Sequence, residues 1–224
     1  EDLAKQNDGM DYVFVLDISG SMGTDGKMGI SRQSLGAFIE ELQAGDRFQV
    51  LTFNLQPYPL FDGLHEGNTE AKGQAASFLK AQETRGGTLL NPALALAYKY
   101  ANPDRTLNVV VLSDGMTEQQ ERQALLGLIQ QRPRNCRVFC IGVGNEVNRP
   151  LLEQMAEDSG GLAAFLSPGD DFGRQAKAFR RKLMNPVATG LQIDFGGLQV
   201  YDMEPKAVPN LYHGAPVRVY GRYR

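Results

Sequence analysis

The sequence predicts an α/β fold, in which a central, mostly parallel β-sheet is flanked by helices on both faces and followed by a C-terminal β appendage. Apolar runs such as 13–16 (VFVL) and 107–112 (LNVVVL) are typical of strands that are buried on both faces. Segments with helical periodicity separate these runs, and such alternation favours a parallel sheet. After Asn185-Pro186 the pattern changes to short alternating segments, which indicate the appendage.

In the first part of the chain, apolar periodicity and proline placement define the expected elements. Apolar residues at helical spacing predict helices, and the two prolines Pro57 and Pro59 exclude a central strand because proline cannot donate to a ladder. The expected elements are a strand at 13–16, a helix over 27–42, a strand at 48–53, an edge strand or irregular hairpin at 55–64, and a helix over 69–82.

The second part continues the alternation. Asn91-Pro92 resembles an N-cap followed by proline at the first helical position, so a helix is expected to start there. The expected elements are helices over 93–101, 118–130, 151–156 and 170–184, with strands at 107–112, 138–143 and 163–166.

The appendage begins with a segment that alternates at period two, 189–195, followed by Gly196-Gly197, which is a hairpin turn signal. Further strands are expected at 198–203 and 217–220. The predicted organisation is therefore a leader at 1–10, one α/β domain at 11–184 and a β-strand extension at 185–224.

Composition limits the classes of function. The 224 residues are 42% hydrophobic and 22% charged, which is enough apolar material for a core and argues against disorder. A net charge of −3 gives no overall basic field, so no nucleic acid partner is expected. No apolar run reaches 18 residues, so we expect no membrane contact from this part of the protein.

The chain opens with polar residues and without methionine. We therefore expect a piece of a longer protein, and the compartment stays open: export or attachment to the cell envelope would depend on other parts.

Two cysteines, Cys136 and Cys140, lie at the two ends of a predicted strand. Such a segment spans about 13 Å, whereas the Cα atoms of a disulfide lie about 5.5 Å apart. The pair is therefore not expected to form a disulfide, and the chain has no further cysteine for a metal site. Cys140 is predicted to be a free, buried thiol.

Oxygen-bearing side chains follow the predicted strands at three places. Asp17, Ser19 and Ser21 form D-x-S-x-S directly after the strand at 13–16, Thr88 ends a Gly-Gly-Thr loop, and Asp114 follows the strand at 107–112. In open parallel sheets, ligands bind beyond the carboxyl ends of the strands. Carboxylates and hydroxyls are hard oxygen ligands of the kind that Mg²⁺ prefers, so the sequence predicts a metal site.

Each part of this pattern also has a plainer interpretation. Asp, Ser and Gly are the usual turn residues, so D-x-S-x-S by itself would be consistent with a turn. Asp25 is interpreted as a turn residue, and Ser113 and Thr117 as hydrogen-bonding residues of the Asp114 loop. Glu118 is interpreted as a favourable charge at a helix N-terminus. The order of the motifs and their positions after strands favour the metal site.

The motifs resemble the metal-ion-dependent adhesion site (MIDAS) of von Willebrand factor A (vWA) domains. The matching segments are DISGSM at 17–22, GGT at 86–88 and SDG at 113–115, and residues 11–184 look like a complete vWA domain with its Rossmann-like fold.

More narrowly, the chain is similar to vWA domains of the inter-α-trypsin inhibitor heavy-chain type, including bacterial relatives. The segments that carry this resemblance are 42–53 (LQAGDRFQVLTF), 139–144 (FCIGVG) and the tail 205–222, with VPNLYHG and VRVYGR. In that family a β-rich VIT domain commonly precedes the vWA domain.

The resemblance implies a non-enzymatic module for protein–protein interaction or adhesion. Ser19, Ser21 and Thr88 would be hydroxyl ligands of Mg²⁺, with Mn²⁺ and Ca²⁺ as alternatives, while Asp17 and Asp114 would act directly or through water. An acidic side chain of a protein partner would complete the metal's coordination.

Three other functions remain open. The domain could be an adaptor that works with an ATPase, as in some bacterial vWA proteins, or a structural domain with an idle site. An enzyme is disfavoured, because the chain lacks G-x-S-x-G around its serines and any P-loop pattern. A phosphoaspartyl hydrolase would carry a second Asp where Ser19 stands.

Overall fold

The structure is a computed structural model. It describes residues 9–117, 119–167, 169–171, 174–175, 177–178, 186–188, 191–204, 208, 210–212 and 217–224.

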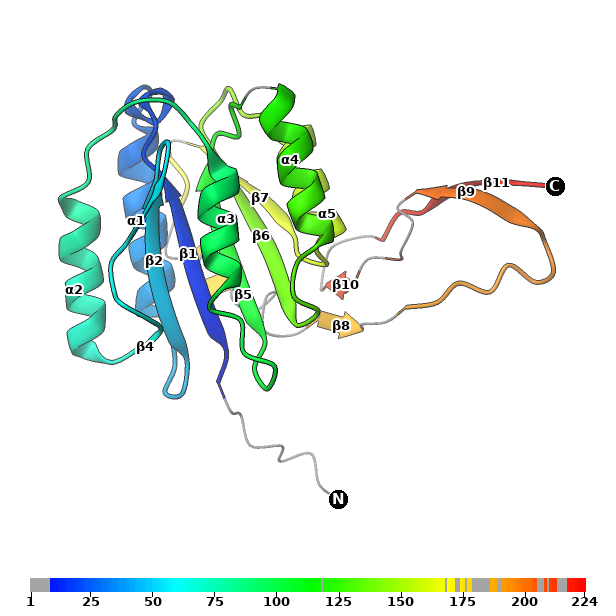
Figure 1. Cartoon of the computed structure of the whole chain (residues 1–224), viewed down its shortest axis with the longest axis horizontal. Helices are drawn as coiled ribbons and strands as arrows, with labels where there is room; N and C mark the ends of the chain where they lie inside the picture. Colours follow the sequence, from blue (N-terminus) through cyan, green and yellow to red (C-terminus); the bar gives the residue numbers. More distant parts are fainter. Residues whose placement is uncertain are drawn as a thin grey trace, which may run out of the picture.

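A seven-stranded sheet forms the centre of the molecule, with the order β3-β2-β1-β5-β6-β7 and β4 beside β2 (Figure 1). β1, β2, β5, β6 and β7 run parallel to one another, and β3 and β4 pair antiparallel with β2. The strands are β1 (Asp11–Asp17), β2 (Arg47–Phe53), β3 (Pro57–Pro59), β4 (His65–Glu66), β5 (Leu107–Ser113), β6 (Cys136–Val143) and β7 (Ala163–Leu166). The α/β fold class and the edge position of the proline-containing segment are confirmed.

Helices cover both faces of the sheet, and the alternation of β1 shows how. Tyr12, Phe14 and Leu16 pack in one buried cluster with α1 and α2, whereas Val13 and Val15 pack in a second cluster with α3, α4 and α5. A strand that is covered on both faces needs apolar residues at every position, which explains the uninterrupted run. The helices whose bounds fall within the described residues are η1 (Gly20–Gly23), α1 (Lys27–Glu40), α2 (Thr69–Lys80), α3 (Leu90–Tyr98), α4 (Gln119–Gln130) and α5 (Arg149–Asp158).

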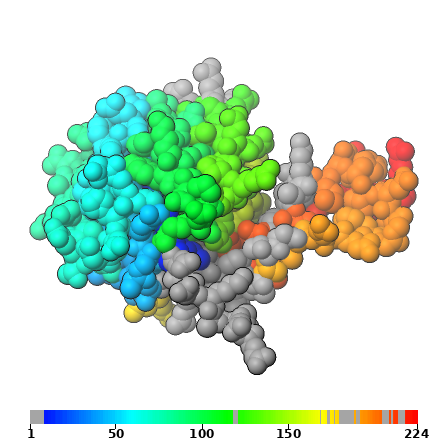
Figure 2. All heavy atoms as spheres, turned by 60° about the horizontal axis from the view of Figure 1, so that its bottom comes forward, coloured from blue at the N-terminus to red at the C-terminus, as the bar shows by residue number. Residues whose placement is uncertain are grey.

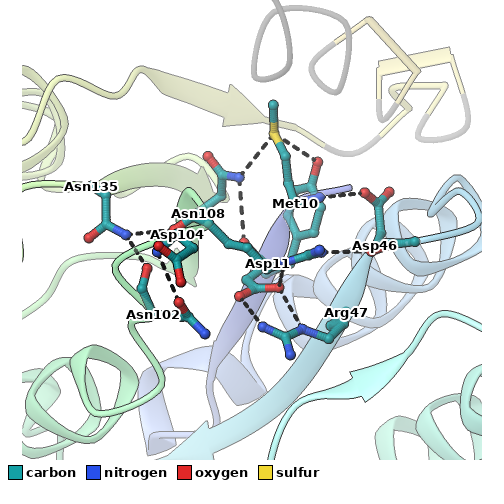
Figure 3. Close-up of polar contacts among 11 residues, drawn as sticks. Met10, Asp11, Asp46, Arg47, Asn102, Asp104, Asn108 and Asn135 are labelled. Atoms are coloured by element: carbon teal, nitrogen blue, oxygen red, sulfur yellow. Dashed lines mark hydrogen bonds and ion pairs between the residues drawn. The ribbon is translucent and has the colours of Figure 1, made fainter. Parts of the chain in front are cut away.

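A polar network holds the amino-terminal end of β1 (Figure 3). The buried Asp11 carboxylate accepts hydrogen bonds from Arg47 Nε at 2.9 Å and Nη2 at 2.7 Å, and from Arg105 Nε at 2.8 Å. Met10 N donates to Asp46 Oδ1 at 2.9 Å. These contacts connect the start of β1 to β2 and to the segment before β5.

The predicted start of α3 is wrong. Asn91 is not the N-cap, because α3 begins at Leu90 with Leu89 in the N-cap position. The Asn91 N–H is one of the helix's unpaired first donors, and Glu121 Oε1 of α4 accepts from it at 2.8 Å. A side chain from another helix has therefore taken over the role that the sequence suggested for Asn91.

The appendage differs from its prediction in part. Residues 191–195 form no strand, although Gly196 and Gly197 form a turn at φ of 61° and 90°. Two small antiparallel sheets are present instead, and they pair β8 (Pro186–Ala188) with β10 (Leu211–Tyr212), and β9 (Val200–Glu204) with β11 (Tyr220–Tyr223). β9 confirms the strand expected at 198–203, whereas the strand expected at 217–220 starts only at Tyr220. The strands of this region pair by long-range contacts that a local alternation pattern does not encode.

The pair β9–β11 stands out from the body of the molecule in both views (Figures 1 and 2). The tail is anchored elsewhere, through Tyr212, which is 1% exposed and lies in the buried cluster of α1 and α2. Its ring packs edge to face against Phe139 of β6, with the ring centroids 6.2 Å apart, and its hydroxyl donates to the Gly160 carbonyl at 2.6 Å. Glu118 lies outside the described residues, and so does most of the helix predicted over 170–184, of which residues 174–175 and 177–178 are described and helical.

Candidate metal centre

Two buried carboxylates meet at the carboxyl ends of neighbouring strands. β1 pairs in parallel with β5, with Leu16 opposite Leu112, so Asp17 at the end of β1 and Asp114 just after β5 come to the same edge of the sheet. Both aspartates are 0% exposed. The structure therefore places these two sequence-predicted residues side by side at one site.

The Asp17 carboxylate is fixed by neutral donors. Its Oδ1 accepts the Ser19 N–H at 2.8 Å, and its Oδ2 accepts the Ser113 hydroxyl at 2.6 Å. Ser113 Oγ in turn accepts the Gly115 N–H at 2.9 Å, which confirms Ser113 as a hydrogen-bonding residue of this loop. Each Asp17 oxygen retains a further lone pair, but the side chain cannot rotate without breaking these bonds.

Burial raises the pKa of the Asp17 carboxyl above its ordinary value of 3.8. The hydrogen bonds from Ser113 and Ser19 lower this pKa, and the neighbouring Asp114 charge raises it. Desolvation is the largest of these effects. A buried carboxylate with only neutral donors gains most from a nearby cation.

The two serine hydroxyls converge. Ser19 Oγ and Ser21 Oγ are 3.2 Å apart across the tight turn of η1. Two adjacent oxygen ligands of an octahedral Mg²⁺, each about 2.1 Å from the ion, lie about 3 Å from each other. The observed separation fits a shared hard cation.

Backbone hydrogen bonds hold the loop of Thr88 against this turn. Gly20 N donates to the Gly86 carbonyl at 3.0 Å, and Arg85 N donates to the Ile18 carbonyl at 2.8 Å. Gly86 has φ of 68°, a left-handed conformation in which glycine is least strained. The half-buried Thr88 follows two residues later in the same loop.

Thr88 also lines an adjacent pocket of about 470 Å³. The other lining residues are Leu55, Gly87, Leu89, Met116, Thr117 and Glu121. The prediction for Thr117 is wrong, because its Oγ1 is buried with no hydrogen-bond partner among the described residues. Asp25 is confirmed as a turn residue, at φ of 53°.

Lys27 is a member of the site that the sequence analysis missed. Its Nζ donates to Asp114 Oδ2 at 3.0 Å, and the side chains of this ion pair are 5% and 0% exposed. The other carboxylate oxygen, Oδ1, accepts the Met116 N–H at 3.1 Å. A signal for Lys27 existed: it is the first residue of α1, where a cation opposes the helix dipole.

The donor set suits a hard divalent cation held by few charges. In the described part of the chain, no three His, Cys, Asp or Glu side chains gather at one point. The site instead combines two carboxylates with hydroxyls, which are the oxygen donors that Mg²⁺ and Mn²⁺ accept. Soft metals that require thiolate or several imidazole ligands do not fit this set.

Comparison with known proteins identifies the family of the chain. Residues 10–165 match the sequence model of the von Willebrand factor type A domain. The chain belongs to the vWA domain family. Among curated relatives, the vWA chain is 26% identical over 223 residues to inter-alpha-trypsin inhibitor heavy chain H3 of Homo sapiens and 27% identical over 224 residues to that of Bos taurus.

The vWA chain spans about a quarter of the length of these curated relatives. The alignments cover 93% and 94% of this chain, but 25% of each relative. The resemblance to the inter-α-trypsin inhibitor heavy-chain type, which the sequence predicted, is therefore confirmed for this part of those proteins.

Solved structures share the fold. A von Willebrand factor type A protein from Catenulispora acidiphila superposes with a TM-score of 0.70 at 18% identity, over 95% of this chain and 55% of that one. Proximal thread matrix protein 1 of the mussel byssus, in a structure with a zinc-occupied MIDAS motif, gives 0.58 at 19% identity, over 77% and 44%. None of the helices in the described part of this chain has both the length and the apolar character needed to cross a membrane.

Proposed function

We propose that this vWA domain is a non-enzymatic, metal-dependent protein-binding module. Ser19, Ser21 and Thr88 would bind a divalent cation through their hydroxyls, and Asp17 and Asp114 would act directly or through water. The metal is Mg²⁺, with Mn²⁺ and Ca²⁺ as alternatives. An acidic side chain of the partner protein completes the coordination shell.

The observation that carries this proposal is the convergence of the Ser19 and Ser21 hydroxyls, 3.2 Å apart, on the turn that follows the buried Asp17, with the buried Asp114 at the end of the neighbouring strand. Both Asp17 oxygens and both Asp114 oxygens already accept hydrogen bonds from the protein. Each of these oxygens therefore has only one lone pair left for a metal or a water molecule, and the neutral hydroxyls add ligands without adding negative charge, which leaves the cation electrophilic. An electrophilic metal attracts a carboxylate from outside.

The surface around the site supports a protein as partner. Leu55, Leu89 and Met116 are 55%, 36% and 49% exposed, and all three line the pocket that Thr88 shares. Outside the appendage, these are the exposed large apolar side chains of the described residues. Exposed apolar residues gathered beside a polar centre are typical of interaction sites.

We also propose the organisation into a leader at 1–10, a vWA domain at 11–184 and an extension at 185–224, although Tyr212 connects the extension to the core. The alternative roles are an adaptor of an ATPase or of a multiprotein complex, and a structural domain with an idle site. The exposed apolar side chains of Leu55, Leu89 and Met116 favour partner binding over a structural domain with an idle site.

Thermal unfolding with and without Mg²⁺ tests the metal site. A ligand that binds only the folded state at 100 times its Kd stabilises by about 2.7 kcal/mol. We expect saturating Mg²⁺ to raise the Tm of the wild type and to leave that of Ser19→Ala/Ser21→Ala unchanged. Ser77→Ala, on an exposed face of α2 where its hydroxyl donates only to Gly73 O, is the matched control.

A pull-down from cell extract in Mg²⁺ and in EDTA then tests the partner. We expect a protein that the wild type retains in Mg²⁺ and that is lost both in EDTA and with the double variant. The same protein in every lane would move the interface away from the cation site.

In the thermal-unfolding test, equal Tm shifts in the wild type and the double variant would refute the ligand assignment.

A further inference from the structure

Lys27 reaches the candidate metal centre through Asp114. It begins α1, and its side chain crosses to the end of β6, where a Cβ at Gly144 would lie 2.8 Å from Lys27 Cε. Gly144, at φ of 101°, therefore leaves the room through which the aliphatic stem passes. The stem carries the ammonium to Asp114 Oδ2 at 3.0 Å.

This position is costly for a lysine. The side chain is 5% exposed, and the ammonium lies at a helix N-terminus, where the dipole opposes a positive charge. A buried ion pair loses much of its attraction to desolvation, so packing and stability alone are weak reasons for it. The two buried carboxylates give a better reason for a lysine at this position. Asp17 and Asp114 are both buried, and among the contacts described above only Asp114 has a cationic partner, which is Lys27.

We propose that Lys27 is a tethered cation that balances Asp114 when no metal is bound and weakens the binding of the metal. This inference rests on the proposed function. With Lys27 protonated, the two aspartates leave the site one negative charge; a bound divalent cation changes that to one positive charge. A single carboxylate from the partner then makes the site neutral.

The consequence is cooperative binding. The lone domain holds its metal weakly, because the cation must enter beside an ammonium that already pairs with Asp114. An acidic partner removes the excess positive charge and strengthens metal binding, and the metal strengthens partner binding by the same factor. Lys27 thereby sets the requirement for the partner's carboxylate.

Calorimetric titration with Mn²⁺ alone tests this inference on four proteins: the wild type, Lys27→Met, Lys27→Arg and Lys80→Met. Lys80 is an exposed lysine at the end of α2, so Lys80→Met removes the same charge away from the site. We expect Lys27→Met to bind Mn²⁺ roughly tenfold more tightly, because the repulsion is removed and Asp114 is released. Lys27→Arg and Lys80→Met should stay close to the wild type.

A second measurement separates this role from packing. Without metal, Lys27→Met should unfold at a lower temperature than Lys80→Met, and saturating Mn²⁺ should remove most of that difference. If Lys27→Met does not fold, Lys27→Gln replaces it as a neutral, polar variant.

Unchanged Mn²⁺ affinity in Lys27→Met, with normal binding by the wild type, would overturn the role of Lys27 and leave the proposed function intact. Weaker binding by Lys27→Met would also overturn it, since Lys27 would then assist the metal. If no variant binds Mn²⁺, the metal site itself is refuted and this inference falls with it.

Discussion

Residues of similar type have different roles at this site because their partners differ. Asp17 is held by neutral donors from Ser19 and Ser113, whereas Asp114 is held by the Lys27 ammonium. The D-x-S-x-S run and the aspartate after β5 were predictable because consecutive turn residues and strand ends are local features. The contact with Lys27 was not, because it depends on how α1 packs beside β6.

The two thiols offer a test at the scale of single residues. Cys136 and Cys140 are free, as predicted, and are 1% and 0% exposed. Burial raises the pKa of both thiols to about 12. Since only the thiolate reacts, both should be unreactive toward Ellman's reagent in the folded protein at pH 8.

In guanidinium chloride, where burial is lost, both thiols should react at the rate of an ordinary cysteine. Comparing the two time courses at the same pH is the measurement. Rapid reaction of one thiol under native conditions would contradict the buried environment.

At the scale of elements, the parallel sheet with helices on both faces was predictable, whereas the exact ends of individual elements were not. Apolar runs identify strands, and in a strand alternate side chains point to opposite faces of the sheet. The alternation of β1 residues between the two buried clusters follows from this. The start of α3 was misjudged because Glu121 of α4 accepts the hydrogen bond from Asn91 N, and no pattern within 89–93 contains that acceptor. Long-range side-chain contacts such as this one replace local capping signals.

On the side that faces away from β5, the amino-terminal half of β6 is hydrogen-bonded by a side chain, that of Ser159. β7 pairs with β6 only from Cys140 onward, and before that point Ser159 Oγ accepts the Val138 N–H at 3.1 Å. Ser159→Ala would leave that buried N–H unpaired, which costs about 1–3 kcal/mol. We expect the free energy of unfolding in urea to fall by that amount.

Ser77→Ala is again the matched control, because it removes a hydroxyl from an exposed position of α2. It should change the free energy of unfolding by about 0.5 kcal/mol or less. Equal effects of the two substitutions would show that the edge of β6 does not depend on Ser159.

At the scale of the whole molecule, the tail is part of the domain's packing. Composition places a boundary near residue 185, since the pattern changes after Asn185-Pro186. Tyr212 nevertheless lies in the buried cluster with α1 and α2, against Phe139. A tyrosine in a short polar segment gives no local sign of a burial site that a strand much earlier in the chain provides.

Substitutions at Tyr212 measure how strongly the tail stabilises the body. Tyr212→Phe removes the hydrogen bond to the Gly160 carbonyl and should cost about 0.5–1.5 kcal/mol. Tyr212→Ala removes the buried ring as well and should cost about 3–5 kcal/mol, measured by urea unfolding.

Tyr220→Ala is the control for this pair, because Tyr220 is 67% exposed on β11. It should leave the free energy of unfolding within about 0.5 kcal/mol of the wild type. If Tyr212→Ala were equally mild, the tail would be an independent attachment.

The Asp11 network also has a mechanical meaning. The chain enters β1 at the end that Arg47 and Arg105 hold, and the candidate metal centre lies at the other end of the same strand. Tension between a captured partner and residue 9 would therefore run along β1. The parallel ladders to β2 and β5 would then be loaded in shear, with many hydrogen bonds resisting at once, instead of being peeled apart one after another.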